Sequence, residues 1–380
     1  MNNIILLGIT SLLTDISSEM VYPILPIYLV NQLGAGPAIL GLIEGIAESL
    51  SSLLKVFSGY FSDKTKSRKP FTIAGYSASA VGKLLLYASF NWWFVLAART
   101  VDRFGKGVRT APRDALIADS AHDKKKGAAF GLHRAMDTLG ATIGVLAAYL
   151  IITKYKGAFK NIFLFSLIPA LFGVLFLFFV KENKGRIRAS AARVQFKWSA
   201  LDKRLKYFLV FTFIFALGNS SNQFLLLRAK DLGSPLSQVI LFYLVYNIIF
   251  GLVTYPASRL SDSIGRKKLL VLGYLFYGLV YLWFAVNSSV NSLWFMFGVY
   301  GLYTAFTEGV EKALVADIAP VQMRATAIGL HATLVGIGLL PASLLAGILW
   351  RFLGPAWAFY FGSFMGVTAS VGLWFILKDA

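Results

Sequence analysis

The sequence predicts an all-α integral membrane protein whose twelve transmembrane helices form two pseudo-symmetric six-helix bundles. Composition is the first observation behind this prediction, because hydrophobic residues make up 57% of the chain and charged residues 14%. Globular proteins contain about 45–50% and about 25%, respectively. Length is the second, since twelve spans of about 20 apolar residues would use most of the 380 positions. Room for a soluble catalytic domain is therefore lacking, and we do not expect an enzyme.

Apolar runs separated by short polar segments give the position of each helix. We expect the first six helices at residues 4–30, 37–62, 71–90, 92–120, 127–152 and 160–180. We expect the other six at residues 207–228, 236–257, 268–287, 291–318, 325–350 and 355–377. The long basic connection 183–206 then separates an N-terminal bundle, residues 1–182, from a C-terminal bundle, residues 207–380. We expect this connection to lie along the anionic cytoplasmic leaflet.

The net charge of +19 has a simple explanation in such a protein. Lys and Arg collect in the even-numbered connections, and cytoplasmic loops of membrane proteins are enriched in both residues. This bias predicts a multi-pass protein of the inner (cytoplasmic) membrane with both termini in the cytoplasm, and no nucleic-acid partner. Cysteine is absent and no pair of the three histidines has metal-ligand spacing, so we expect no metal and no cofactor.

An internal repeat is the third observation. The segment ALIADSA at residues 115–121 returns as ALVADIA at residues 313–319. The segment GLH at residues 131–133 returns at residues 329–331, with the same offset of 198. Such self-similarity indicates one duplicated structural unit. Because each unit contains an even number of helices, the two copies have the same orientation in the membrane.

Two basic loops carry a resemblance to a known family. The segments GYFSDKTKSRK (59–69) and SRLSDSIGRKK (258–268) resemble the loop signature G-x-x-x-D-R-x-G-R-R of the major facilitator superfamily. The first copy departs from it at Lys66 and Ser67, and the second copy has Ser258 in place of the leading glycine. Together with the spans, the repeat and the linker, the resemblance covers essentially the whole chain.

The resemblance implies that these loops form a conformational latch that stabilises an outward-open state. An aspartate in the loop can cap a neighbouring helix N-terminus, where the helix dipole favours an anion. We expect Arg113, with Asp114, to form an ion pair with the loop around Asp63. The predicted latch residues are Gly59, Asp63, Lys64, Arg68, Lys69, Arg113, Asp262, Arg266 and Lys267.

Ionisable residues inside the predicted spans are concentrated in the N-terminal bundle. Asp15 and Glu19 are four residues apart, as are Glu44 and Glu48, so each pair lies on one helix face. The equivalent positions of the second copy are uncharged. Because both copies share one scaffold, helix packing alone does not require these charges, and charges within a membrane are expensive. A functional role is therefore predicted for them.

The residue types indicate two kinds of site. A carboxyl group in an apolar environment favours its protonated form, and the predicted proton-coupling residues are Asp15, Glu19, Glu44, Glu48 and Asp137. The planar guanidinium of Arg103 suits a carboxylate or phosphate. The predicted substrate-binding residues are Arg99, Arg103, Lys106, Asn219, Asn222, Gln223, Tyr243 and Asn247. Lys83 and Asp102 could instead neutralise each other and have no functional role. For His133 and His331, the alternative to a functional role is helix packing or a loop contact.

These observations predict a monomeric, proton-coupled secondary active transporter that works by alternating access. Export of a small amphipathic or anionic solute by H⁺ antiport is the preferred interpretation, since the acids of the first helix resemble those of bacterial exporters. Uptake of an organic anion or phosphorylated metabolite, or a lysophospholipid flippase, are alternatives, and Na⁺ could replace H⁺ as the coupling ion. No nucleotide-binding motif is present. A membrane sensor without transport would instead have a mutually satisfied charge cluster.

Overall fold

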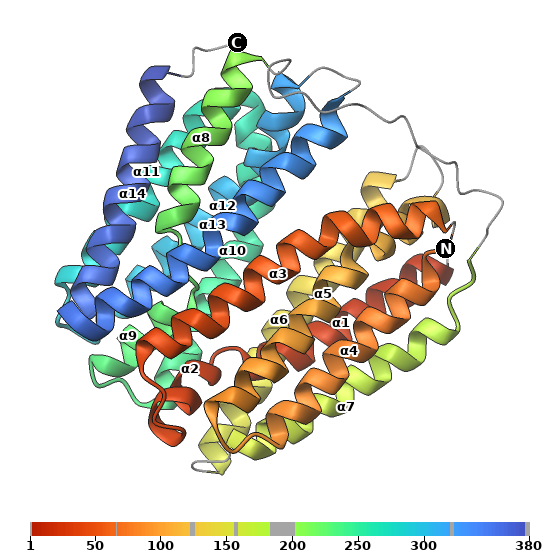
Figure 1. The fold of residues 1–380 in the computed structure, drawn as a ribbon, viewed down its shortest axis with the longest axis horizontal. Coiled ribbons are helices and arrows are strands. Elements are labelled where there is room, and N and C mark those ends of the chain that lie inside the picture. The colour runs from red at the N-terminus through yellow and green to blue at the C-terminus, as the bar shows by residue number, and fades with distance from the viewer. Residues whose placement is uncertain are drawn as a thin grey trace. The chain divides into compact units, whose positions relative to one another are not determined.

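The computed structural model describes residues 2–65, 67–121, 126–155, 159–182, 202–319 and 323–376, and the regular elements within them are helical (Figure 1). Most of the predicted connection 183–206 lies outside the described residues. The elements of the first half are α1 (Asn2–Val21), α2 (Leu25–Ile27), the π-helix η1 (Tyr28–Gln32), α3 (Pro37–Lys64), α4 (Lys69–Tyr87), α5 (Trp92–Ser120), α6 (Lys126–Lys154) and α7 (Phe159–Phe178). Those of the second half are α8 (Lys203–Gly218), α9 (Gln223–Asp231), α10 (Leu236–Ile264), α11 (Arg266–Val286), α12 (Leu293–Ile318), α13 (Arg324–Leu353) and α14 (Pro355–Ile376).

The predicted spans are present, but two of them are broken. The span 4–30 divides after Val21, next to Pro23, which lacks the amide hydrogen that continues a helix. The span 207–228 divides after Gly218 and resumes at Gln223. The second break has no proline; its short polar side chains compete for the backbone, and the Ser221 hydroxyl accepts from the Gln223 amide at 3.4 Å. The two breaks occupy equivalent places in the repeat.

Among the described residues, eight segments are long and apolar enough to cross a membrane by length and composition alone. They comprise α1 with α2 and η1, α8 with α9, and the helices α6, α7, α10, α11, α13 and α14. The other long helices are α3, α4, α5 and α12. Three of these four, in the first half, bear most of the buried charged side chains that the structure describes. The less apolar spans are therefore the ones that carry the ionic groups described below.

The described residues cluster into two compact units. The first contains α1, α2, η1, α4–α7, residues 46–64 of α3 and residues 236–241 of α10. The second contains α8, α9, α11–α14, residues 36–45 and the remainder of α10. Each unit thus includes a short segment from the other half of the sequence, while the division of the chain at 183–206 stays a prediction.

Glycines allow the closest helix pair of the first unit to approach, which positions the charges of α5 beside α4. A Cβ atom on Gly75 of α4 would lie 2.6 Å from the Gly105 carbonyl oxygen and 2.6 Å from Cβ of Arg109, both on α5. A Cβ on Gly82 would lie 2.9 Å from Cβ of Asp102. Small residues at such contacts are typical of membrane helix pairs.

We expect Gly75→Ala to lower the free energy of unfolding by about 1–3 kcal/mol, because the added methyl group forces α4 away from α5. Thermal unfolding of the purified protein in detergent measures the effect. Gly131→Ala is the matched control, since a Cβ at Gly131 of α6 meets no atom within 4 Å. Equal melting temperatures for the two variants would contradict this account of α4–α5 packing.

Candidate functional site

A sealed ionic triple lies between α4 and α5 in the first unit. The Lys83 ammonium contacts the Asp102 carboxylate at 2.9 Å, and the Arg99 guanidinium contacts its other oxygen at 3.5 Å. The three residues are between 4% and 6% exposed. Lys83 also donates to the Ser18 hydroxyl of α1 at 3.3 Å. Lys83 and Asp102 therefore neutralise each other. Arg99 of α5 carries the one excess positive charge of the triple.

One helical turn further along α5, Arg103 contacts Glu48 of α3. Its guanidinium Nη2 lies 2.8 Å from the Glu48 carboxylate oxygen. Arg103 is 7% exposed, whereas the Glu48 side chain is 28% exposed. A predicted substrate-binding residue and a predicted proton-coupling residue are thus joined in one ion pair, whose carboxylate end can be reached from outside the helix bundle.

Asp15, Glu19 and Lys106 are only half-buried. Asp15 on α1 lies within electrostatic range of Glu19, Lys106 and Asp137, which come from α1, α5 and α6. Lys106 in turn lies within range of Glu48. Besides the sealed triple, the first unit therefore contains a group of partly accessible acidic and basic side chains that lie within electrostatic range of one another.

The predicted contact of Arg113 with the Asp63 loop is not among those that the described residues make. Arg113 instead donates to the Asp114 carboxylate at 2.8 and 3.0 Å and to the Ser11 hydroxyl of α1 at 3.3 Å. Nearby on α6, the His133 imidazole lies 3.4 Å from the Asp137 carboxylate. The contacts of Arg113 thus join α5 to α1. A different arginine contacts Asp63.

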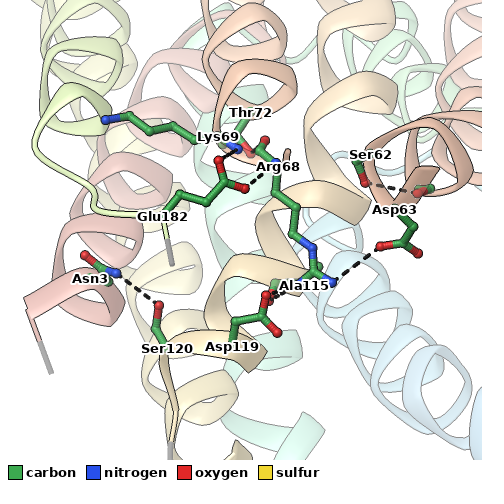
Figure 2. A network of polar contacts seen from close by, with 11 residues as sticks. Asn3, Ser62, Asp63, Arg68, Lys69, Thr72, Ala115, Asp119, Ser120 and Glu182 are labelled. Carbon is green, nitrogen blue, oxygen red and sulfur yellow. Dashed lines mark hydrogen bonds and ion pairs between the residues drawn. The ribbon is translucent and has the colours of Figure 1, made fainter. Parts of the chain in front are cut away.

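That arginine is Arg68, which precedes α4 and forms the centre of the network in Figure 2. Its guanidinium donates to the Ala115 carbonyl at 2.9 Å, binds the Asp119 carboxylate, and contacts Asp63 at 3.4 Å. Asp63 lies in the last turn of α3, and Ala115 and Asp119 lie one turn apart near the end of α5. We call these four residues the first clamp, because they connect three helices at one end of the unit.

Glu182 caps the N-terminus of α4 beside the first clamp (Figure 2). Its carboxylate accepts from the backbone amides of Arg68 and Lys69, where the helix dipole favours an anion. The Lys69 ammonium donates to the Phe178 carbonyl at 2.8 Å, and Asn3 donates to the Lys181 carbonyl at 2.7 Å. The capping role that the loop signature suggested for an aspartate thus belongs to Glu182.

The second unit repeats the clamp. Arg266 donates to the Ala313 carbonyl at 2.6 Å and contacts Asp317 at 2.6 Å and Asp262 at 3.4 Å. These four residues, the second clamp, match the first clamp partner for partner. The repeated segment ALxAD supplies a carbonyl and a carboxylate on one helix face, so the repeat was a signal for this site, although its role was not inferred from the sequence.

Three further predicted latch residues lie around the clamps. A Cβ on Gly59 would be 3.3 Å from Cβ of Ala111, so α3 passes close to α5 there. The Lys267 ammonium lies 5.6 Å from the centre of the Trp374 ring. Lys64 is exposed at the end of α3. A role of any of these residues in conformational switching stays a prediction.

The predicted polar residues of the second unit lie at and near the break between α8 and α9. Asn222 accepts from the Tyr300 hydroxyl at 2.7 Å, and Asn247 donates to the Tyr243 carbonyl at 3.0 Å. Gln223 is fully buried, and neither of its amide atoms has a hydrogen-bond partner among the described residues.

Two further predicted residues belong to the same unit. Asn219 directly follows α8 and is half-buried. Glu44 is fully buried and accepts from the Ser221 hydroxyl at 3.3 Å. Glu48 lies one turn further along α3.

We expect Arg68→Ala to lower the free energy of unfolding by about 2–3 kcal/mol, because a partly buried carbonyl and a carboxylate lose a charged donor. Arg266→Ala should have a smaller effect, since the Arg266 side chain is 25% exposed against 9% for Arg68. Thermal unfolding in detergent compares the two variants. A larger loss for Arg266→Ala would contradict this ranking of the clamps.

The sealed triple gives a separate expectation. Asp102→Leu should destabilise the protein by about 3–5 kcal/mol, because it leaves Lys83 buried without its carboxylate. The double variant Lys83→Met/Asp102→Leu should recover part of this loss, as a double-mutant cycle of unfolding measurements would show. If the double variant lost as much stability as the sum of the losses of Lys83→Met and Asp102→Leu, the Lys83–Asp102 contact would have no structural effect.

Comparison with known proteins agrees with this architecture. The family model described as Major Facilitator Superfamily matches residues 7–218 and again residues 207–380. An uncharacterized MFS-type transporter of Methanocaldococcus jannaschii is 40% identical, over 98% of this chain and 94% of the relative. The multidrug resistance protein MdtH of Edwardsiella ictaluri is 24% identical, over 84% of this chain and 80% of the relative.

Solved structures show the same fold at low sequence identity. The nucleoside transporter NupG has a TM-score of 0.80 at 14% identity, with 100% of both chains covered. A D-xylose-proton symporter has a TM-score of 0.79 at 17% identity, with 100% of this chain and 98% of that chain covered. The two matches of the family model, one to each half, also agree with the internal repeat. The chain belongs to the Major Facilitator Superfamily and is a membrane-spanning transporter of that family.

Proposed function

We propose that this transporter is proton-coupled and exports small amphipathic solutes by H⁺ antiport. The single observation that carries the proposal is the partly accessible set of acids and bases in the first unit, formed by Asp15, Glu19 and Lys106. Charged groups within a membrane are costly, and their retention in half-buried positions favours a role in carrying ions or solutes. A sensor without transport would have left every such group sealed, as Lys83 and Asp102 are.

Asp15 and Glu19 supply the antiport step. Both side chains lie on one face of α1 and are half-buried. A carboxylate there can hold either a proton or a positively charged or hydrogen-bond-donating group of a solute, but not both at once. Binding of one therefore releases the other, and this competition links export of the solute to entry of a proton. The likeness to MdtH of Edwardsiella ictaluri, a multidrug resistance protein, supports this direction.

The Glu48–Arg103 pair supports a second candidate function, proton-linked uptake of an organic anion. A proton on Glu48 would neutralise the carboxylate and release the Arg103 guanidinium, which lies 2.8 Å away. Arg103 could then bind a carboxylate or phosphate in bidentate fashion. Proton and anion would bind together in this case, so they would move in the same direction. The two candidates thus differ in the sign of the coupling and in the acid that carries it.

We expect Asp15→Asn to lower gradient-driven transport of a fluorescent amphipathic cation by roughly tenfold or more, because the amide cannot exchange a proton. Transport is measured in proteoliposomes under an imposed pH gradient, and solute exchange without a gradient should persist. Glu308→Gln, an exposed acid of α12, is the matched control and should behave as the wild type.

The same assay separates the two candidate functions. Under the antiport proposal Glu48→Gln retains cation export, whereas under anion uptake it uncouples anion entry from the pH gradient. Undiminished gradient-driven export in Asp15→Asn would remove Asp15 from the mechanism. Anion accumulation that follows the proton gradient in the wild type would replace the export proposal with the uptake proposal.

A further inference from the structure

The end of α10 that contributes to the second clamp carries an open groove of about 730 Å³. This volume lies within the range of small-molecule sites, about 300–1,000 Å³. The groove is lined by Tyr255, Pro256, Arg259, Leu260, Asp262 and Ser263. All six residues belong to α10 and to the second unit. One helix end thus brings a guanidinium, a phenol and apolar side chains to the same site.

Arg259 is the cation of this groove, and its side chain is exposed. Among the residues that the structure describes, it forms no ion pair and no hydrogen bond. Asp262, the one acid in the sequence of α10, instead contacts Arg266 at 3.4 Å within the second clamp. The donors of the Arg259 guanidinium are therefore available to a ligand.

The same stretch of α10 exposes apolar side chains. Tyr255 is 75% exposed and Leu252 is 69% exposed, and Leu260 and Ile264 are exposed as well. Because α10 is long and apolar enough to cross a membrane, these side chains are suited to contact with acyl chains. Arg259 lies among them near the end of the span, where headgroups replace the hydrocarbon region.

Other side chains at this end of the second unit are typical of a membrane interface. Residues 259–268 contain four basic residues and one acid, and such clusters attract anionic lipids. The Lys267 ammonium lies 5.6 Å from the centre of the Trp374 ring, and tryptophan is enriched at the level of the headgroups. An anionic headgroup at Arg259 would therefore meet a favourable potential as well as a direct partner.

The repeat shows that the clamp itself does not need Arg259. Asp63 and Asp262 are equivalent residues of the two loop segments, so Tyr60 of α3 corresponds to Arg259 of α10. Both clamps nevertheless form. The scaffold thus accepts an uncharged side chain at this position, and the guanidinium is a feature of the second copy alone.

We propose that this groove binds the headgroup of an anionic phospholipid from the leaflet at the clamp end of the second unit. The Arg259 guanidinium binds the phosphate in bidentate fashion, and the Tyr255 hydroxyl donates to the headgroup. The acyl chains lie along Leu252 and Leu260, which favours a lipid over a soluble anion. The predicted orientation of the chain makes this the cytoplasmic leaflet. The site does not depend on the proposed export.

A site-specific measurement tests the proposal, because the chain contains no cysteine. Ile264→Cys, next to the lining residue Ser263, carries a fluorophore, and the labelled protein is reconstituted in phosphatidylcholine vesicles. Phosphatidylglycerol with brominated acyl chains quenches the fluorophore when it binds nearby. In this labelled protein we expect Arg259→Gln to weaken phosphatidylglycerol binding by about fivefold, since one cation at a lipid surface is worth about 1 kcal/mol.

Lys268→Gln is the matched control, because it removes the same charge from an exposed position outside the groove. It should keep the affinity of the parent protein for phosphatidylglycerol. Equal losses in the two variants would mean that only a general attraction to a negative membrane acts, and the proposal would be wrong. Brominated phosphatidylcholine that binds as tightly as phosphatidylglycerol would also overturn it, since the phosphatidylcholine headgroup has no net charge.

Inorganic phosphate distinguishes a lipid from a soluble anion. A large excess of phosphate should leave the quenching unchanged, and its displacement of phosphatidylglycerol would assign the groove to a soluble anion instead. Thermal unfolding in detergent is a second measurement that needs no label. Phosphatidylglycerol should raise the melting temperature of the wild type, because a ligand stabilises the state that binds it. An equal rise in Arg259→Gln would contradict the proposal.

Discussion

The first unit depends on one constraint: a charged group buried among apolar helices needs an oppositely charged partner. Lys83 and Asp102 satisfy this constraint for each other. Their 2.9 Å contact, which is almost inaccessible to solvent, joins α4 to α5 by a buried ion pair. Gly75 and Gly82 bring the helix backbones close enough for this contact. Among the charges beside that sealed pair, Glu48, Lys106 and the acids of α1 keep partial access. Structural and functional charges thus occupy one helix but differ in exposure.

The two clamps show how a duplicated sequence keeps its architecture while its chemistry diverges. Arg68 and Arg266 have equivalent partners, each made of a carbonyl and an aspartate one turn apart in the repeated ALxAD segment and a second aspartate before the arginine. Within the bundles the copies differ. Tyr76 and His133 recur as Tyr274 and His331, but Arg113 of the first copy corresponds to Glu311 of the second. Contacts at the ends of the helices are therefore common to both copies, and the charge pattern inside is not.

The fold could be predicted from the sequence because apolar composition, span length and the repeat are properties of the chain itself. The breaks after Val21 and Gly218 were missed, since an apolar run looks continuous whether or not its backbone hydrogen bonds continue. The sequence grouped Asp15 with Glu19 by their spacing on one helix. It did not give the partners of Arg68, because Ala115 and Asp119 lie far away in sequence and one of the two contacts is to a backbone carbonyl. Glu182 follows the last span of its half, where no helix periodicity marks it.

Every contact of the first clamp lies in the first unit, and every contact of the second clamp lies in the second. Glu182, which caps α4, belongs to the first unit as well. A substitution that removes a partner of Arg68 therefore leaves every described contact of Arg266 in place, and the reverse also holds. Damage to one helix-end assembly is thus confined to the unit that contains it.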